Sequence, residues 1–189
     1  MNVLPTPIQD LVVIEPRVFK DDRGYFFEQY NKEKMLQKGL KYEFIQDNQS
    51  KSTYGVIRGL HYQLAPYAQT KLVRAVVGKI FDVAVDLRKN SPTFGHWYGI
   101  ELSDENFLQL LVPKGFAHGF SVLSETAIVH YKCDCLYNPQ AERGINFADK
   151  TLNIDWKVEM ATAAVSAKDR VHPDLEKAEM NFVFGSSEL

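Results

Sequence analysis

Cysteine is nearly absent from the sequence. The two cysteines, Cys133 and Cys135, stand two positions apart. On a strand they would share a face and point in parallel, which is poor geometry for a disulfide. We therefore expect a reduced protein, for which a cytoplasmic location is the simplest interpretation. No apolar run approaches the length needed to span a bilayer, and residues 1–10 show no signal-peptide pattern.

An excess of charge of one sign is also missing. Lys and Arg number 22 against 24 Asp and Glu, giving a formal net charge of -2. No global basic field therefore points to nucleic acid or to an anionic membrane, although a local cluster of cations could still bind a small anion. Hydrophobic residues make up 45% of the 189 residues, which is enough for the core of one globular domain spanning 1–189.

Several catalytic and ligand-binding motifs are missing as well. The sequence has no serine nucleophile elbow, no P-loop and no glycine-rich dinucleotide fingerprint. No two of its histidines stand two positions apart as metal ligands often do, and only His61, His118 and Glu101 offer a set that could converge on zinc or iron. What remains is acid–base chemistry without a metal, carried by histidine, tyrosine, lysine and arginine side chains around one cavity.

What the sequence does contain is a series of short strands separated by turn residues about every ten positions, a pattern typical of an all-β sandwich or barrel. Strict alternation from Ile80 to Arg88 predicts a half-buried antiparallel strand. Two further strands are predicted at Trp97 to Leu102 and Phe107 to Val112, with residues 103–106 as the hairpin between them. A cavity between such strands, lined by polar side chains, is a natural ligand site.

Two segments outside the strands have a helical pattern. Asn31 is predicted to cap a short helix from Lys32 to Lys38, which Gly39 ends. The tail from Ser166 to Leu189 is predicted to be irregular, with one or two helical turns around Asp174 to Met180.

The chain is organised around the stretch GVIRGLHYQ at residues 55–63, which reads as a strand that carries polar groups into a cavity. Alternation puts His61 and Gln63 on one face and Arg58 on the other. If Arg58 and His61 serve one site, the strand must bend between them, and Gly59 would permit a bulge there.

Other polar residues allow two interpretations from spacing alone. Gln46 and Asn48 share a strand face, either on an exposed edge or hydrogen-bonded to a sugar or base. Arg23 follows turn residues and is most simply a solvated cation paired with Asp21 or Glu28. His118, flanked by aromatic residues, is most simply a structural hydrogen-bonding group.

A set of sequence runs changes these interpretations. In chain order they are FxDxRGxFxE at 19–28, QDN at 46–48, RGLHYQ at 58–63, QxKLV at 69–73, FDVAVDxR at 81–88, SPTFG at 91–95, GFAHGF at 115–120, YK at 131–132 and SAKD at 166–169. Each run alone is weak, but the ordered set resembles the dTDP-4-dehydrorhamnose 3,5-epimerase family over nearly the whole chain. The resemblance implies a cupin-type jelly-roll β-barrel with short flanking helices, a homodimer, and no metal or other cofactor.

The resemblance also implies a substrate and a mechanism. The substrate is a dTDP-linked 4-keto-6-deoxyhexose, epimerised at C3 and C5 in dTDP-L-rhamnose biosynthesis. By resemblance, His61 is the base and Asp169 its orienting partner. Tyr131 is the acid on the opposite side of the sugar, and Lys71 stabilises the enolate oxygen.

Binding residues are implied in the same way. Arg23 and Arg58 would meet the diphosphate, because guanidinium forks match phosphate oxygens. The remaining assignments concern the nucleotide and the sugar: Glu28, Gln46 and Asn48 hold the nucleotide with Phe26 nearby, Tyr137 stacks on thymine, His118 contacts the sugar, and Glu142 and Lys168 line the site. The other histidines, His96, His130 and His172, are left as ordinary surface or structural residues.

One run departs from the family pattern. Where the family commonly shows Trp-Asn-Asp, this chain has Phe147, Ala148 and Asp149, which puts local loop packing in question more than proton chemistry. Two alternatives remain open from the sequence: an epimerase that inverts only C3 of another dTDP-deoxysugar, and a non-catalytic or metal-binding cupin.

Overall fold

The computed structural model describes residues 1–186, and nearly all of its regular structure is β. The end of the predicted tail, residues 187–189, lies outside the described residues. The strands are β1 (Asn2–Pro5), β2 (Val12–Glu15), β3 (Val18–Asp21), β4 (Gly24–Phe27), β5 (Gln46–Thr53), β6 (Val56–Gln63), β7 (Lys71–Val77), β8 (Lys79–Asp86), β9 (Trp97–Ser103), β10 (Gln109–Val112), β11 (Phe116–Val122), β12 (Thr126–Cys133), β13 (Glu142–Gly144) and β14 (Ala164–Val165). The helices are α1 (Lys32–Gln37) and the 3-10 turns η1 (Asp169–Val171) and η2 (Leu175–Lys177).

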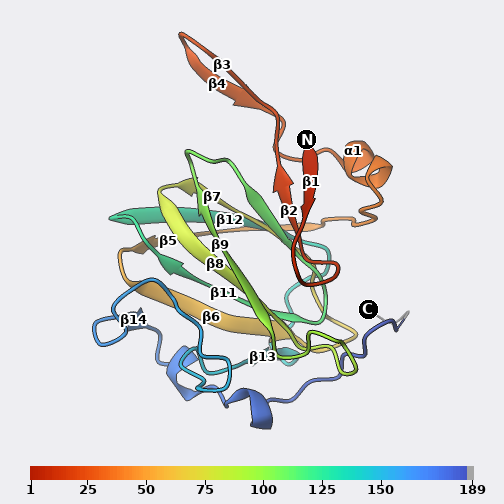
Figure 1. Ribbon diagram of the computed structural model, residues 1–189, viewed down its shortest axis with the longest axis vertical. Helices are drawn as coiled ribbons and strands as arrows, with labels where there is room; N and C mark the ends of the chain where they lie inside the picture. Colours follow the sequence, from red (N-terminus) through yellow and green to blue (C-terminus); the bar gives the residue numbers. More distant parts are fainter. Residues whose placement is uncertain (187–189) are drawn as a thin grey trace.

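Two sheets pack face to face, as Figure 1 shows. The first has the strand order β1-β2-β10-β7-β12-β5, and the second the order β13-β6-β11-β8-β9, with β14 added against β6. A buried apolar cluster fills the space between them, with Val73 and Val129 from the first sheet and Ala84 and Phe120 from the second. The cupin-type jelly roll with short flanking helices is confirmed. No helix within residues 1–186 is both long and apolar enough to cross a membrane.

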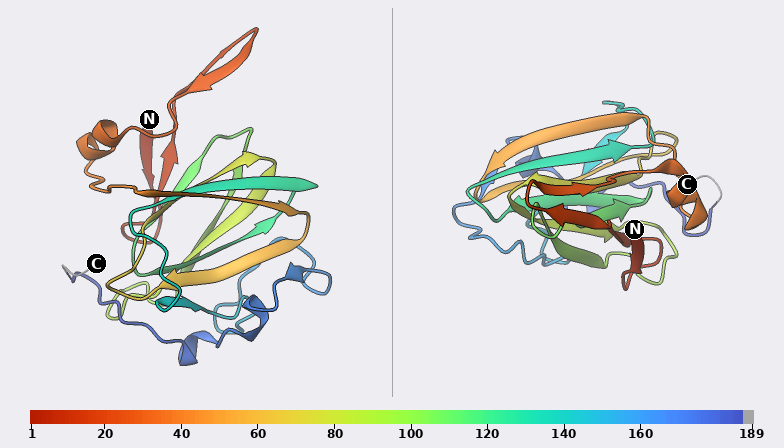
Figure 2. Two further views of the ribbon diagram at one scale, coloured as in Figure 1. Left: turned by 180° about the vertical axis from the view of Figure 1, so that it is seen from behind. Right: turned by 90° about the horizontal axis from the view of Figure 1, so that it is seen from above.

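The second sheet is covered on its outer face as well. There Val83 and Val85 of β8 pack in a second buried cluster with Trp156 and Phe182 from the C-terminal segment. Figures 1 and 2 show this segment, in blue, running across that face. Strand β8 is therefore buried on both faces, and the prediction of a half-buried strand is wrong, because alternation there separates two apolar environments rather than core from solvent.

Strands β9 and β10 were predicted to form a hairpin, and this is also wrong. Strand β9 pairs with β8 in the second sheet, whereas β10 pairs with β2 and β7 in the first. Residues between them form a turn in which the backbone N–H of Ser103 donates to the Asn106 side chain over 3.0 Å. The turn residues were correctly located, but they mark a crossover between sheets.

Strands β3 and β4 form a separate hairpin that stands away from the two sheets (Figures 1 and 2). Phe19, Tyr25 and Phe26 are exposed on it, Phe26 with 70% of its surface accessible. The helix predicted after it is confirmed: the Asn31 side chain accepts from the N–H of Lys34 over 3.1 Å at the start of α1. Gly39 follows the helix with φ +81.

Candidate active site

A cavity of about 220 Å³ opens between the ends of the two sheets. It is lined by Gln46, Asn48, His61, Tyr62, Gln63, Gln69, Lys71, Tyr131, Tyr137 and Glu142. A second cavity, of about 310 Å³, lies elsewhere among Arg88, Lys114 and Asp134 and contains none of the residues predicted from the sequence. Because three of the four predicted catalytic residues line the smaller cavity, its chemistry makes it the candidate active site.

The strand that carries His61 bends where the sequence predicted. His61 lies opposite His118 on β11, and Arg58 lies opposite Phe120, so β6 contains one residue more than its partner in this interval. Gly59 stands within the bulge with φ +122, and a Cβ there would lie 2.5 Å from the Cα of Gly119. Only glycine fits this close approach of the two strands.

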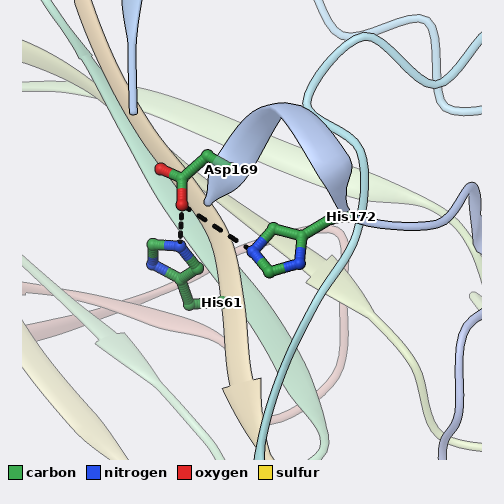
Figure 3. Close-up of side chains that lie close together, drawn as sticks. All are labelled: His61, Asp169 and His172. Carbon is green, nitrogen blue, oxygen red and sulfur yellow. Dashed lines mark hydrogen bonds and ion pairs between the residues drawn. The ribbon is translucent and has the colours of Figure 1, made fainter. Parts of the chain in front are cut away.

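His61 and Asp169 form a hydrogen-bonded pair, shown in Figure 3. Nε2 of His61 lies 2.7 Å from Oδ1 of Asp169, and the backbone N–H of Gly59 donates to Oδ2 over 3.3 Å. Burial alone would raise the pKa of Asp169, but the hydrogen bond and charge of His61 hold it below its usual value. The carboxylate therefore stays ionised and fixes the imidazole with Nδ1 available to take a proton.

The opposite wall of the cavity comes from the first sheet. Tyr131 pairs with Asn48, and Cys133 pairs with both Gln46 and Lys71, so alternation turns these side chains to the same face. Burial raises the pKa of Tyr131, so its phenol keeps its proton at neutral pH. Burial also lowers the pKa of Lys71, against the opposing effect of nearby acidic groups. This wall thus presents a proton donor and a half-buried amine.

A carboxylate at the rim connects two more predicted residues. Tyr137 donates from its hydroxyl to Oε2 of Glu142 over 2.6 Å, and Lys168 pairs with the same oxygen. Burial would raise the pKa of Glu142, but these two donors hold it below its usual value. Gln46 accepts from the backbone N–H of Tyr137 over 2.9 Å, which ties this rim to β5.

Arg58 and His118 lie beside the cavity rather than on its lining. The guanidinium of Arg58 donates to Ser52 over 3.0 Å, and its charge acts on Tyr131. Nε2 of His118 lies 2.8 Å from Oδ1 of buried Asp82. His118 therefore has the structural partner that its sequence environment suggested. Glu101 pairs with Lys79 on the exposed side of β9, so His61, His118 and Glu101 do not form the metal set considered from the sequence.

Three predicted binding residues are not brought to this cavity within the chain. Arg23 and Phe26 lie on the projecting hairpin, where Arg23 pairs with Asp21 over 2.6 Å. Glu28 follows the hairpin and pairs with Lys34 over 2.7 Å. Within one chain, Arg23 thus has the solvated ion pair that spacing alone suggested.

Some lining residues were not predicted. Gln63 follows His61 by two positions and Gln69 precedes Lys71 by two, a spacing that could have indicated both. Gln63 also positions the rim, because it accepts from the backbone N–H of Asn138 over 2.7 Å. Tyr62 lines the cavity although alternation turns it away from His61, and no sequence signal indicated it.

The loop that departs from the family pattern is well packed. Asp149 is buried and accepts from the backbone N–H groups of Leu152 and Leu175. The carbonyl of Phe147 accepts from the indole of Trp156 over 2.8 Å, and the Phe147 side chain packs on the outer apolar cluster. The aromatic residue and the aspartate therefore hold the loop without the missing amide.

Comparisons with known proteins identify the family of the chain. The profile of the dTDP-4-dehydrorhamnose 3,5-epimerase family matches residues 5–177. A curated enzyme of that name from Shigella flexneri is 58% identical over 161 residues, 84% of this chain and 88% of its own length. The crystal structure of one from Elizabethkingia anophelis NUHP1 is 54% identical, with a TM-score of 0.89 over 93% of this chain and 97% of that one.

A further solved relative carries a ligand. The enzyme from Legionella pneumophila Philadelphia 1, in complex with dTDP-4-keto-L-rhamnose, is 45% identical, with a TM-score of 0.89 over 93% of each chain. The sequence runs, the jelly roll and these comparisons lead to one conclusion. This chain belongs to the dTDP-4-dehydrorhamnose 3,5-epimerase family, whose members are isomerases that act on carbohydrates.

Proposed function

We propose that this chain converts dTDP-4-dehydro-6-deoxy-D-glucose to dTDP-4-dehydro-L-rhamnose, with His61, Asp169, Tyr131 and Lys71 as its catalytic groups. The C4 ketone acidifies the hydrogens on C3 and C5. A base removes one of them to give an enolate, and an acid returns a proton to the opposite face. The observation that carries this assignment is the arrangement of His61 and Tyr131 on different sheets, lining one cavity.

His61 acts as the base through Nδ1. Its Nε2 is engaged by Asp169 at 2.7 Å, which sets the tautomer and stabilises the imidazolium that forms when the proton arrives. The ionised state of Asp169 supports this role, since its pKa is held low by His61. The proton moves from carbon to Nδ1, the electron pair of the broken C–H bond forms the C=C bond of the enolate, and the π electrons of the carbonyl group move to the C4 oxygen.

Tyr131 and Lys71 complete the step. The raised pKa of Tyr131 keeps the phenol protonated until the enolate needs a proton. Lys71 faces the same cavity, where an ammonium group stabilises the negative charge that develops on the C4 oxygen. The charge of the enolate in turn favours the protonated form of this half-buried amine.

The nucleotide is bound by the rim and its surroundings. Tyr137 is exposed and offers a ring for stacking on thymine, while Gln46 and Asn48 offer amides. Arg58 and His118 lie beside the cavity rather than on its lining, and we expect the diphosphate to reach Arg58 and the sugar to reach His118. Glu142 and Lys168 form an ion pair at the rim and line the site.

Arg23, Phe26 and Glu28 reach the substrate from a second copy of the chain. The projecting hairpin exposes aromatic side chains, and exposed apolar surface of this kind marks an interaction site. In a homodimer with two-fold symmetry, each hairpin would enter the other chain's site. The chain acts as a single domain. A cytoplasmic location fits its two free cysteines.

Solvent exchange tests the assignment. Incubation with the ketosugar in deuterated water should place deuterium at C3 and C5, read by NMR. Exchange at C3 but never at C5 would instead support a C3-only epimerase. His61→Ala should abolish exchange with the fold retained by circular dichroism, while His96→Ala, at an exposed position, should leave it unchanged. Retained turnover in His61→Ala would refute the mechanism and favour a different base.

A further inference from the structure

His172 stands directly behind the catalytic pair and has no role in the proposed mechanism. It follows η1, the turn that carries Asp169. Its Nε2 lies 3.7 Å from Oδ1 of Asp169, the same oxygen that lies 2.7 Å from Nε2 of His61. Figure 3 shows a nitrogen of each imidazole directed at this oxygen. The distance of 3.7 Å is too long for a hydrogen bond, so the two imidazoles converge on one carboxylate but only one is bonded to it.

Packing holds the ring of His172 in this place. A Cβ on Gly144 would lie 2.4 Å from the imidazole, so the ring rests directly on the backbone of β13. Gly144 is itself paired with His61, and the two imidazoles meet edge to face with centroids 5.7 Å apart. Nε2 of His172 is buried and has no hydrogen-bond partner among residues 1–186. Buried polar atoms in proteins nearly always have a partner, and a bound ligand would supply the one that this nitrogen lacks.

The three groups have the composition and spacing of a metal site. Their ligand atoms all lie within 4.8 Å of one another. In tetrahedral zinc sites, bonds of about 2.0–2.2 Å place the ligand atoms about 3.3 Å apart. The distances from Oδ1 of Asp169 to Nε2 of His61, 2.7 Å, and to Nε2 of His172, 3.7 Å, lie on either side of that value. Two imidazoles and one carboxylate are donors that zinc and its neighbours in the first transition row accept.

The position of the three groups beside the cavity decides where a bound ion would lie. His61 lines the cavity whereas Asp169 and His172 do not, so an ion held by Nε2 of His61 would lie behind its ring, on the side away from the substrate.

We propose that His61, Asp169 and His172 form an inhibitory site for a divalent transition-metal ion of the Zn²⁺ class. The inference rests on the proposed role of His61 as the base. A metal ion on Nε2 of His61 replaces the hydrogen bond to Asp169, and the ring proton moves from Nε2 to Nδ1. Nδ1 then carries a proton and cannot accept one from carbon. The ion therefore switches off the base without removing any residue, and its release restores the original tautomer.

Binding is measured first and without reference to activity. The metal-free protein is titrated with Zn²⁺ by calorimetry and with Co²⁺ by visible absorption, whose d–d bands report nitrogen and oxygen ligands. We expect one ion per chain, and no binding of Mg²⁺, which prefers oxygen ligands. His172→Phe, which keeps a planar ring, and His172→Asn should each weaken Zn²⁺ binding at least tenfold. His96→Gln is the control at an exposed position and should bind as the wild type does.

Inhibition is measured second, as the ratio of the rates of deuterium exchange into the ketosugar with and without Zn²⁺. We expect Zn²⁺ to inhibit the wild type reversibly, with recovery on adding EDTA, and at least tenfold more Zn²⁺ to be needed in the folded His172 variants. Equal binding by wild type and both variants, or no saturable binding, would overturn the site. Binding without inhibition would overturn the switch. If the metal-free wild type shows no exchange, the proposed function and the switch fail together, while Co²⁺ binding still decides the site.

Discussion

Lys71 and Tyr131 lie side by side on one wall of the cavity, with Nζ of Lys71 6.0 Å from the centre of the phenol ring. The strands that carry them are neighbours in the first sheet, whereas His61 comes from the second. The group proposed to stabilise the enolate oxygen and the group proposed to return the proton therefore share a wall, and the proposed base stands apart from them. An inversion requires this separation, because protons must leave and arrive on opposite faces of one carbon.

The variant Tyr131→Phe tests whether Tyr131 is the acid and His61 the base. Without the phenolic proton, the enolate is reprotonated only from the side of His61, which regenerates the original configuration. We expect inversion to fall by about 10²- to 10⁴-fold. Exchange of the C3 and C5 hydrogens with solvent should persist, because His61 still removes and returns them. NMR of the sugar in deuterated water measures both quantities in one sample. Parallel loss of exchange and inversion would show that Tyr131 is needed for deprotonation itself.

Asp169→Asn tests the partner of the base. The amide removes the charge that stabilises the imidazolium and can hold His61 in the wrong tautomer, so kcat should fall by about 10³- to 10⁴-fold. KM should change far less, since Asp169 does not line the cavity. Steady-state kinetics, coupled to reduction of the 4-keto product, measures both constants. A rise in KM with kcat retained would identify Asp169 as a binding residue instead.

Local features of the fold could be predicted from sequence because the responsible interactions are local. The helix after Asn31 could be predicted because the Asn31 side chain caps the N–H of Lys34, only three residues away. The bulge could be predicted because Gly59 is the residue in this strand that tolerates a positive φ. The burial of β8 and the separation of β9 from β10 were predicted wrongly. They depend on the C-terminal segment and on strand partners, which alternation within a strand does not specify.

For the site too, the sequence indicated local relationships but not which distant residues meet. Periodicity indicated that Gln46 and Asn48 share a face, but the family resemblance was needed to connect them with His61 and Tyr131. His172 was set aside because a single histidine in an irregular tail carries no periodic signal. The turn η1 holds His172 near Asp169, three residues before it, and only the packing of η1 against β6 brings both residues to His61.

Asp86→Asn should destabilise the fold without touching the cavity. Asp86 is fully buried and accepts from the guanidinium of Arg88 at 2.9 Å and from Ser91 at 2.6 Å. Removing one partner of a buried ion pair costs about 3–5 kcal/mol of unfolding free energy. Urea unfolding at neutral pH measures the loss. Asp155→Asn is the matched control, because its pair with Lys157 is exposed and should contribute little.

Asp86 should also make the free energy of unfolding depend on pH. Burial alone would raise the pKa of Asp86, but hydrogen bonds from Arg88 and Ser91 hold it below its ordinary value of 3.8. A carboxyl group with a depressed folded pKa stabilises the fold fully above its unfolded value, and the contribution disappears as the pH falls through the folded value. The stability difference between wild type and Asp86→Asn should therefore be constant at about pH 5 to 8 and shrink below 3.8. A difference that grows on acidification would contradict the ion pair.

Subunit mixing tests whether Arg23 serves the other chain's site. In a homodimer with exchanged hairpins, Arg23→Ala and His61→Ala each inactivate every site of their own dimers. A mixed dimer, however, has one site that combines His61 of one chain with Arg23 of the other, and that site is intact. Random mixing in equal amounts makes half of the dimers mixed, so activity should recover to about a quarter of the wild-type value. If Arg23 instead acts within its own chain, each site of a mixed dimer carries one defect and mixing restores nothing.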